Sequence, residues 1–222
     1  MTQTNRFTAL LLFLCVAVVA QQKISVEEIY SGAFRAKGMD ELQSMKNTNQ
    51  YTVLNADRTT RSMQIDLYDF ATLNKVSTLI DSKNFPDLAN GIDAYSFSSD
   101  EKKILIANNS NPIFRHSFTA DYFLYDTASK QLTKLFEQVQ EPTLSPDAKK
   151  IAFAKDNNLF VYDIASKKIA RITTDGKKNS VINGITDWVY EEEFAFVRAF
   201  DWSADSKKIA FIRFDETDVP EF

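Results

Sequence analysis

Short apolar and alternating runs separated by polar turns dominate the chain and predict β-strands. Three segments align without gaps, and each reads as a strand end, a Ser-x-Asp turn, a Lys-Lys pair and an apolar strand: FSSDEKKILIA (97–107), LSPDAKKIAFA (144–154) and WSADSKKIAFI (202–212). Ser and Asp side chains bond their own backbone in such turns. Many related turns place Gly after the Asp, whereas this position holds Glu101, Ala148 or Ser206. The sequence therefore leaves the turn type open.

A second repeat follows the first and predicts β-hairpins. It reads FLYDTASKQLTKL (123–135) and FVYDIASKKIARI (160–172), with a weaker copy at 66–80. An apolar strand, an Asp-led turn and a second strand are typical of a hairpin. The intervals are 47 residues from Asp100 to Asp147 and 58 residues from Asp147 to Asp205. Four-stranded units at about 40–50 residues predict propeller blades, and a β-sandwich with similar hairpins fits the recurrence of both motifs less well.

We therefore expect an all-β chain that forms a partial β-propeller domain over residues 40–222, with about three and a half blades. Helix is expected only near residues 25–34 and in a short insertion around residues 188–196, within the longer interval. Known propellers close with about four or more blades. The chain is therefore expected to be the N-terminal piece of a longer protein.

The first twenty residues have the pattern of a secretory signal. Arg6 precedes an apolar run at residues 9–20, which is too short to span a bilayer comfortably. Val18 and Ala20 are small residues at the −3 and −1 positions for cleavage before Gln21. We expect a signal peptide at 1–20 and a lead-in segment at 21–39, and an uncleaved membrane anchor is the alternative. The protein would then be exported, to a periplasm, a cell surface or the medium.

Composition excludes several functions. The only cysteine, Cys15, lies in the expected signal, so the exported chain would depend on its core rather than on disulfides. The chain has 44% hydrophobic residues and a net charge of −4, which argues against a nucleic-acid partner. His116 is the only histidine, and the adjacent Ser117 and nearby Ser110 are poorly spaced for a catalytic triad. No catalytic residue is expected in this chain.

The stretch DWVYEEEF (187–194) places three carboxylates, Glu191, Glu192 and Glu193, among aromatic and apolar residues. A solvated turn would not need those neighbours, no DxDxD-type loop supports a metal site, and adjacent carboxylates suit glycosidase chemistry poorly. Two converging carboxylates could instead bind a cation such as a free peptide α-amine. Packed carboxylates repel, and Arg115, in a strand-like stretch, could relieve this repulsion. Spacing alone does not say which two glutamates converge.

Three segments closely resemble the propeller domain of the dipeptidyl peptidase IV family: NGITDWVYEEEF (183–194), RHSFTADYFLYD (115–126) and DETDVPEF (215–222). The resemblance covers most of residues 40–222. It implies an eight-bladed propeller followed by a C-terminal α/β-hydrolase domain that carries Ser, Asp and His and is absent from this chain. It also implies removal of dipeptides from peptides with Pro or Ala in second position.

The resemblance further implies roles for single residues. Glu192 and Glu193, on a short helix, would hold the free amine of the substrate, and Arg115 would contact the substrate carbonyl and pair with the glutamates. The implied partners are peptides with a free N-terminus, the hydrolase domain of the same chain and a second copy in a homodimer, with no cofactor. A non-catalytic peptide- or protein-binding propeller of the same family is the main alternative, and a tripeptide-releasing or endopeptidase relative is another.

Overall fold

The structure, a computed structural model, describes residues 24–36 and 41–220. The chain divides into two compact units, residues 1–40 and 41–222, and the expected signal peptide lies outside the described residues. Within residues 1–40, the expected N-terminal helix is α2 (Val26–Ser31). Ser25 and Glu28 form a reciprocal capping box at its start, and Gly32 ends it with a φ of 81°, which glycine adopts without strain.

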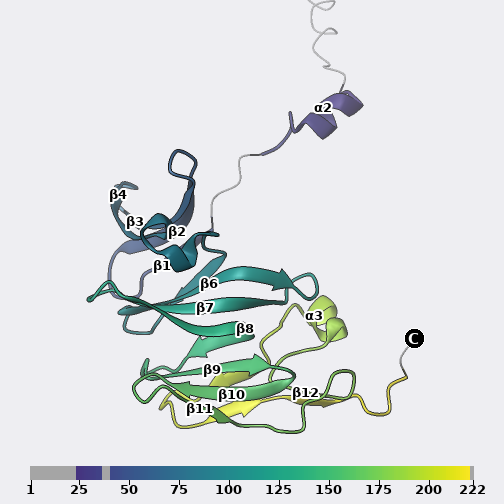
Figure 1. Ribbon diagram of the computed structural model, residues 1–222. Coiled ribbons are helices and arrows are strands. Elements are labelled where there is room, and N and C mark those ends of the chain that lie inside the picture. Colours follow the sequence, from purple (N-terminus) through teal and green to yellow (C-terminus); the bar gives the residue numbers. More distant parts are fainter. Residues whose placement is uncertain (1–23, 37–40, 221–222) are drawn as a thin grey trace, which may run out of the picture. The chain divides into compact units, whose positions relative to one another are not determined.

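The larger region, residues 41–222, begins with a four-stranded antiparallel sheet of order β1-β2-β3-β4 (Figure 1). Its strands are β1 (Leu42–Ser44), β2 (Gln50–Asp57), β3 (Ser62–Asp69) and β4 (Lys75–Asp81). Two short 3-10 helices, Ser82–Asn84 and Pro86–Leu88, connect it to the next sheet. This sheet is the first four-stranded unit of the predicted propeller.

The next sheet has seven antiparallel strands and contains two four-stranded units that share one strand. Its strands are β5 (Ala94–Phe97), β6 (Lys103–Pro112), β7 (Phe118–Asp126), β8 (Leu132–Leu144), β9 (Lys150–Lys155), β10 (Asn158–Asp163) and β11 (Lys168–Arg171). The first part of β8 pairs with β7 and its last part with β9. Gln138 and Glu141 have positive φ values of 49° and 52°, and such residues bend a strand at bulges. The bend lets one strand pass from the second unit to the third.

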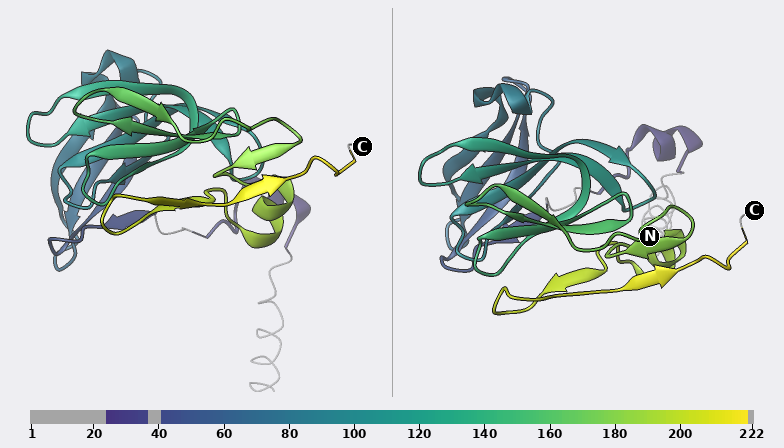
Figure 2. Two further views of the ribbon diagram at one scale, coloured as in Figure 1. Left: turned by 90° about the horizontal axis from the view of Figure 1, so that it is seen from below. Right: turned by 60° about the horizontal axis from the view of Figure 1, so that its bottom comes forward.

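Two short strand pairs complete the described fold: β12 (Val181–Asn183) with β15 (Arg213–Asp215), and β13 (Phe200–Trp202) with β14 (Ile209–Phe211). Figure 2 shows these pairs, in light green to yellow, alongside the seven-stranded sheet. They begin a fourth unit, because Phe200 packs on Ala152 and Leu159 of the third. The prediction of an all-β, propeller-type fold with a short helical insertion is confirmed. No helix in the described part of the chain is long and apolar enough to span a membrane.

The three Ser-x-Asp turns have one common geometry. In each, the Ser hydroxyl donates a hydrogen bond to the Asp carboxylate. The same hydroxyl accepts a hydrogen bond from the backbone amide of the second Lys, and the Asp carboxylate accepts one from the backbone amide of the first Lys. The Ser–Asp pairs are Ser98–Asp100, Ser145–Asp147 and Ser203–Asp205, at 2.7, 2.7 and 2.6 Å. The residue after Asp is left-handed, with φ of 59° at Glu101, 56° at Ala148 and 60° at Ser206. These side-chain bonds offset the roughly 1–2 kcal/mol that a residue other than glycine loses there.

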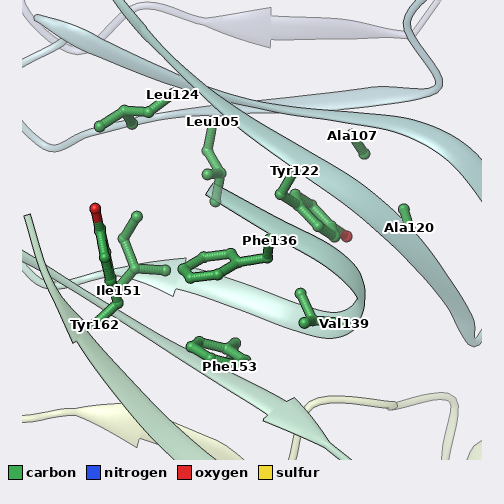
Figure 3. Close-up of a cluster of buried hydrophobic side chains, with 10 residues drawn as sticks. All are labelled: Leu105, Ala107, Ala120, Tyr122, Leu124, Phe136, Val139, Ile151, Phe153 and Tyr162. Carbon is green, nitrogen blue, oxygen red and sulfur yellow. The ribbon is translucent and has the colours of Figure 1, made fainter. Parts of the chain in front are cut away.

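The core lies between successive units because the strands alternate their side chains across two buried faces. On β7, Tyr122 and Leu124 face the third unit, whereas Phe123 and Tyr125 face the first. The cluster between the second and third units is drawn in Figure 3, where the Phe136 ring packs against the tilted ring of Phe153. Burial on both faces explains why these strands read as continuous apolar runs rather than alternating ones.

Helix α3 (Trp188–Phe194) is the second expected helix and lies between β12 and β13. Asp187 caps its start by accepting the Tyr190 amide at 2.8 Å, and Ala195 ends it with a φ of 54°. The Tyr190 ring packs against Phe214 of β15, with ring centroids 4.7 Å apart. The helix is thus fixed at both ends and along one side.

A second carboxylate, Glu216, lies beside the α3 cap. Burial, reinforced by the neighbouring Asp187 carboxylate, raises the pKa of Glu216 from its ordinary 4.5 to about 7. Between these two values the folded chain keeps a proton that the unfolded chain releases. The contribution of Glu216 to stability is therefore present below about pH 4.5 and is lost as the pH rises through 7.

We predict that Phe136→Ala lowers the free energy of unfolding by about 3–5 kcal/mol, because it empties the centre of an inter-unit core. Phe136 is 5% exposed and also meets Tyr162 edge to face. The control is Val76→Ala on β4, where the side chain is 52% exposed and a loss of about 0.5 kcal/mol or less is expected. Urea denaturation measures both, and equal losses would contradict this placement of the core.

We predict that Glu216→Gln removes the pH-dependent weakening of α3. Amide hydrogen exchange over residues 188–194, compared between variant and parent protein at each pH, should be equal near pH 5. At pH 8 it should be slower in the variant, because the repulsion with Asp187 is absent. Asp218→Asn, at an exposed neighbouring carboxylate, is the matched control. If the ratio of exchange rates between the variant and the parent protein is the same at pH 5 and pH 8, the coupling between Glu216 and Asp187 is refuted.

Candidate functional site

The site begins at the β6–β7 hairpin of the second unit. Pro112 and Phe118 are its last paired residues, and Ile113 donates its amide to the Ser117 carbonyl at 2.8 Å. Residues 114–116 therefore reverse the chain direction. Arg115 lies in this loop and not in the strand-like stretch that the sequence indicated, because the β6–β7 ladder ends at the Pro112–Phe118 pair and the residues between them turn the chain back.

Helix α3 meets this loop through the first glutamate of the motif. The Glu191 side chain is fully buried, and its Oε1 accepts the backbone amides of His116 and Ser117, the latter at 3.0 Å. Burial opposes ionisation of Glu191, but the bonds from Ser117 and His116 outweigh it and hold the pKa of Glu191 below its ordinary value. Figure 1 shows α3 beside the end of the β6–β7 hairpin.

The second glutamate forms an ion pair with the arginine. Arg115 Nε lies 3.2 Å from Glu192 Oε1, and the two side chains are 72% and 19% exposed, respectively. Glu192 is thus the half-buried partner of a cation that is itself open to solvent. The structure brings together Arg115 and Glu192, two of the residues that the resemblance singled out.

The third glutamate, Glu193, lies next to Glu192 on α3 and is exposed. Its carboxylate has no hydrogen bond or ion pair among residues 24–36 and 41–220. The three carboxylates therefore differ in their surroundings: one is buried and bonded to backbone, one is paired with an arginine, and one is open. Only the last two are available to a ligand.

A cavity of about 1140 Å³ lies next to this site. Its lining includes Phe114 from the loop, Trp188 and Tyr190 from α3, and the Asp187 and Glu216 carboxylates. Arg115, Glu192 and Glu193 are not among the lining residues. The candidate site in the described residues is thus an open cluster of charges on α3 and the hairpin loop, beside a cavity lined by both apolar and charged side chains.

Two further charged residues lie near Glu191. Burial, together with repulsion from Glu191, raises the pKa of Glu141 on β8, although the Arg198 charge opposes this shift. Arg198 donates to the Thr143 hydroxyl at 3.2 Å. These neighbours could not be predicted from the sequence, since Glu141 and Arg198 belong to no motif. In the described part of the chain, no group of three or more Asp, Glu, His or Cys side chains could hold a metal ion.

Comparisons with known proteins identify the family of this chain. Residues 98–222 match the family described as the dipeptidyl peptidase IV N-terminal region. Dipeptidyl aminopeptidase B of Saccharomyces cerevisiae is 34% identical over 77% of this chain and 20% of its own length. Dipeptidyl peptidase 4 of Bos taurus is 36% identical over 65% of this chain and 19% of its own.

A solved structure resembles most of the fold. The crystal structure of Porphyromonas gingivalis dipeptidyl peptidase 4 superposes with a TM-score of 0.81 and 36% identity, over 91% of this chain and 29% of that one. The chain spans about a fifth of the length of the curated relatives it matches. The family match covers more than half of this chain and includes the whole of α3. The chain therefore belongs to the dipeptidyl peptidase IV family, as part of its N-terminal region.

Proposed function

We propose that this chain is the substrate-binding part of a longer, exported serine exopeptidase that releases N-terminal dipeptides with Pro or Ala in second position. The observation that carries the proposal is the placement of Glu192 and Glu193 on α3 beside Arg115. Relatives named as dipeptidyl peptidases support the reaction class. The role of the glutamates is to bind the free α-amine of the substrate.

The chemistry of an α-amine matches these carboxylates. A protonated amine has one positive charge and three N–H donors, whereas two carboxylates offer charge and acceptors. A hydrogen bond to a charged group contributes about 1.5–3 kcal/mol. Two such bonds would contribute about 3–6 kcal/mol, and each 1.4 kcal/mol corresponds to a factor of about ten in affinity. Amine binding alone could therefore discriminate a hundredfold or more between substrates.

Arg115 is suited to an exchange of partners. An exposed ion pair contributes only about 0–1 kcal/mol to stability, and Arg115 is largely exposed. An arriving amine could replace the guanidinium at Glu192 at small cost. The released guanidinium would then donate hydrogen bonds to the carbonyl of the substrate.

Amine binding would select the scissile bond by distance. The carboxylates hold the amine at a fixed position. Only the second peptide bond of the substrate then lies within reach of the nucleophile. Binding energy at the amine then positions the scissile carbonyl, although the amine does not react. A blocked N-terminus has no charge to offer the carboxylates, so such peptides gain none of this binding energy and are disfavoured.

The nucleophile lies outside this chain in the proposed protein. We propose that Ser, Asp and His come from a C-terminal α/β-hydrolase domain of the longer chain, since the only histidine of this chain, His116, has its nearest serines at positions too close in sequence to converge readily into a triad. The isolated chain would then hydrolyse no peptide. A non-catalytic relative could use the same carboxylates for binding, and turnover of a Gly-Pro substrate by the full-length protein distinguishes the two.

We predict that Glu192→Ala and Glu193→Ala in the full-length protein each lower kcat/KM on a Gly-Pro substrate at least a hundredfold, because each removes a charge-assisted bond to the amine and leaves its neighbour mispaired. Glu137→Ala is the matched control, since the Glu137 side chain is 71% exposed and pairs with Lys134 on the surface; it should retain activity within twofold. A loss below fivefold for both site variants would refute the proposal.

A further inference from the structure

Glu191 is a charged side chain without a role in the proposed amine site. It is 0% exposed, although a carboxylate is among the side chains least often buried completely. Its Oε1 accepts two successive backbone amides, of His116 and Ser117, whereas its Oε2 has no hydrogen-bond partner in the described part of the chain. Burying a carboxylate is costly unless its bonds compensate, so the bonds at Oε1 hold two elements together.

Those two elements are the ones that carry the candidate site. Glu191 and Glu192 are neighbours on α3, and Arg115 and His116 are neighbours in the β6–β7 loop. The helix and the loop are therefore joined twice by successive residues, once through Glu191 and the loop amides and once through Glu192 and Arg115. The sequence separation across the first contact is 74 residues for Ser117, so no local preference of the chain brings these groups together.

The two contacts differ in strength. The outer contact joins an exposed arginine to a half-buried glutamate and is screened by water and salt. The inner contact is buried, where screening is small and charge-assisted bonds to backbone amides are strong. The inner contact therefore determines the separation of loop and helix, and the outer pair follows it.

We propose that Glu191 is a positioning residue: it fixes the Arg115 loop to α3 and so sets where Arg115 stands relative to Glu192 and Glu193. It touches no substrate. The inference rests on the proposed function for its effect on substrates, whereas the link between α3 and the loop stands without it. Nearby titratable or charged side chains on the packed elements are Glu141 on β8, Arg198 after α3 and His116 in the loop.

The test uses the full-length protein with Glu191→Ala and Glu191→Gln. Both loop amides bond to Oε1, and glutamine keeps an oxygen at this position, so Glu191→Gln should keep KM for a Gly-Pro substrate within threefold. Glu191→Ala should raise KM at least tenfold and change kcat less than threefold, because the amine site is misplaced while the nucleophile is untouched. A purely structural role would lower the active fraction, and hence apparent kcat, without changing KM.

A second readout does not depend on activity. Amide hydrogen exchange over residues 113–118 should be at least tenfold faster in Glu191→Ala than in the parent protein, and Glu191→Gln should restore it. Glu137→Ala, at an exposed glutamate, should leave it unchanged. If Glu191→Ala does not fold, Glu191→Asp replaces it: its shorter side chain cannot reach both amides, so a smaller rise in KM and in exchange is expected.

Unchanged KM and unchanged loop exchange in Glu191→Ala, or in Glu191→Asp if the alanine variant does not fold, would overturn the inference. Failure of the proposed function looks different. In that case Glu192→Ala would leave activity intact or the full-length protein would release no dipeptide, while the exchange result would still decide whether Glu191 fixes the loop.

Discussion

The fold depends on one constraint, that each central strand buries side chains on both of its faces. Alternate residues of β6 and β7 enter two separate cores, one shared with the preceding four-stranded unit and one with the following unit. A unit with only one covered face would leave a large apolar surface in water, at about 25 cal/mol for each Å². The units therefore stack, and stacking brings the β6–β7 loop of the second unit next to α3, which lies between β12 and β13 in the chain.

Within that frame, neighbouring carboxylates have different surroundings. Glu191 turns inward and bonds to backbone amides, Glu192 pairs with Arg115, and Glu193 remains open. The separation arises because successive residues on a helix point about 100° apart. A strand would have placed Glu191 and Glu193 on one face, with Glu192 opposite. The helix is thus what leaves two adjacent carboxylates for a ligand and uses the first as an anchor.

Much of the fold was predictable from the sequence, because its signals are local. The Ser-x-Asp turns and Asp-led hairpins use side chains that bond their own backbone, so their recurrence predicts strands and units. Asp187 before an apolar stretch marks the start of α3. The left-handed residue at Glu101 could not be assigned, since the Ser-Asp-Lys bonds compensate for the missing glycine. The burial of Glu191 and the loop position of Arg115 depend on packing across more than 70 residues, which no local pattern encodes.

The central claim is that the carboxylates on α3 recognise a free α-amine. The most direct measurement compares two peptides that differ only at this group, one with a free N-terminus and one acetylated, both with proline second, as substrates of the full-length protein. Acetylation is expected to lower kcat/KM at least a hundredfold, because the acetylated nitrogen carries no charge to pair with Glu192 and Glu193. Values of kcat/KM within fivefold of each other would contradict it.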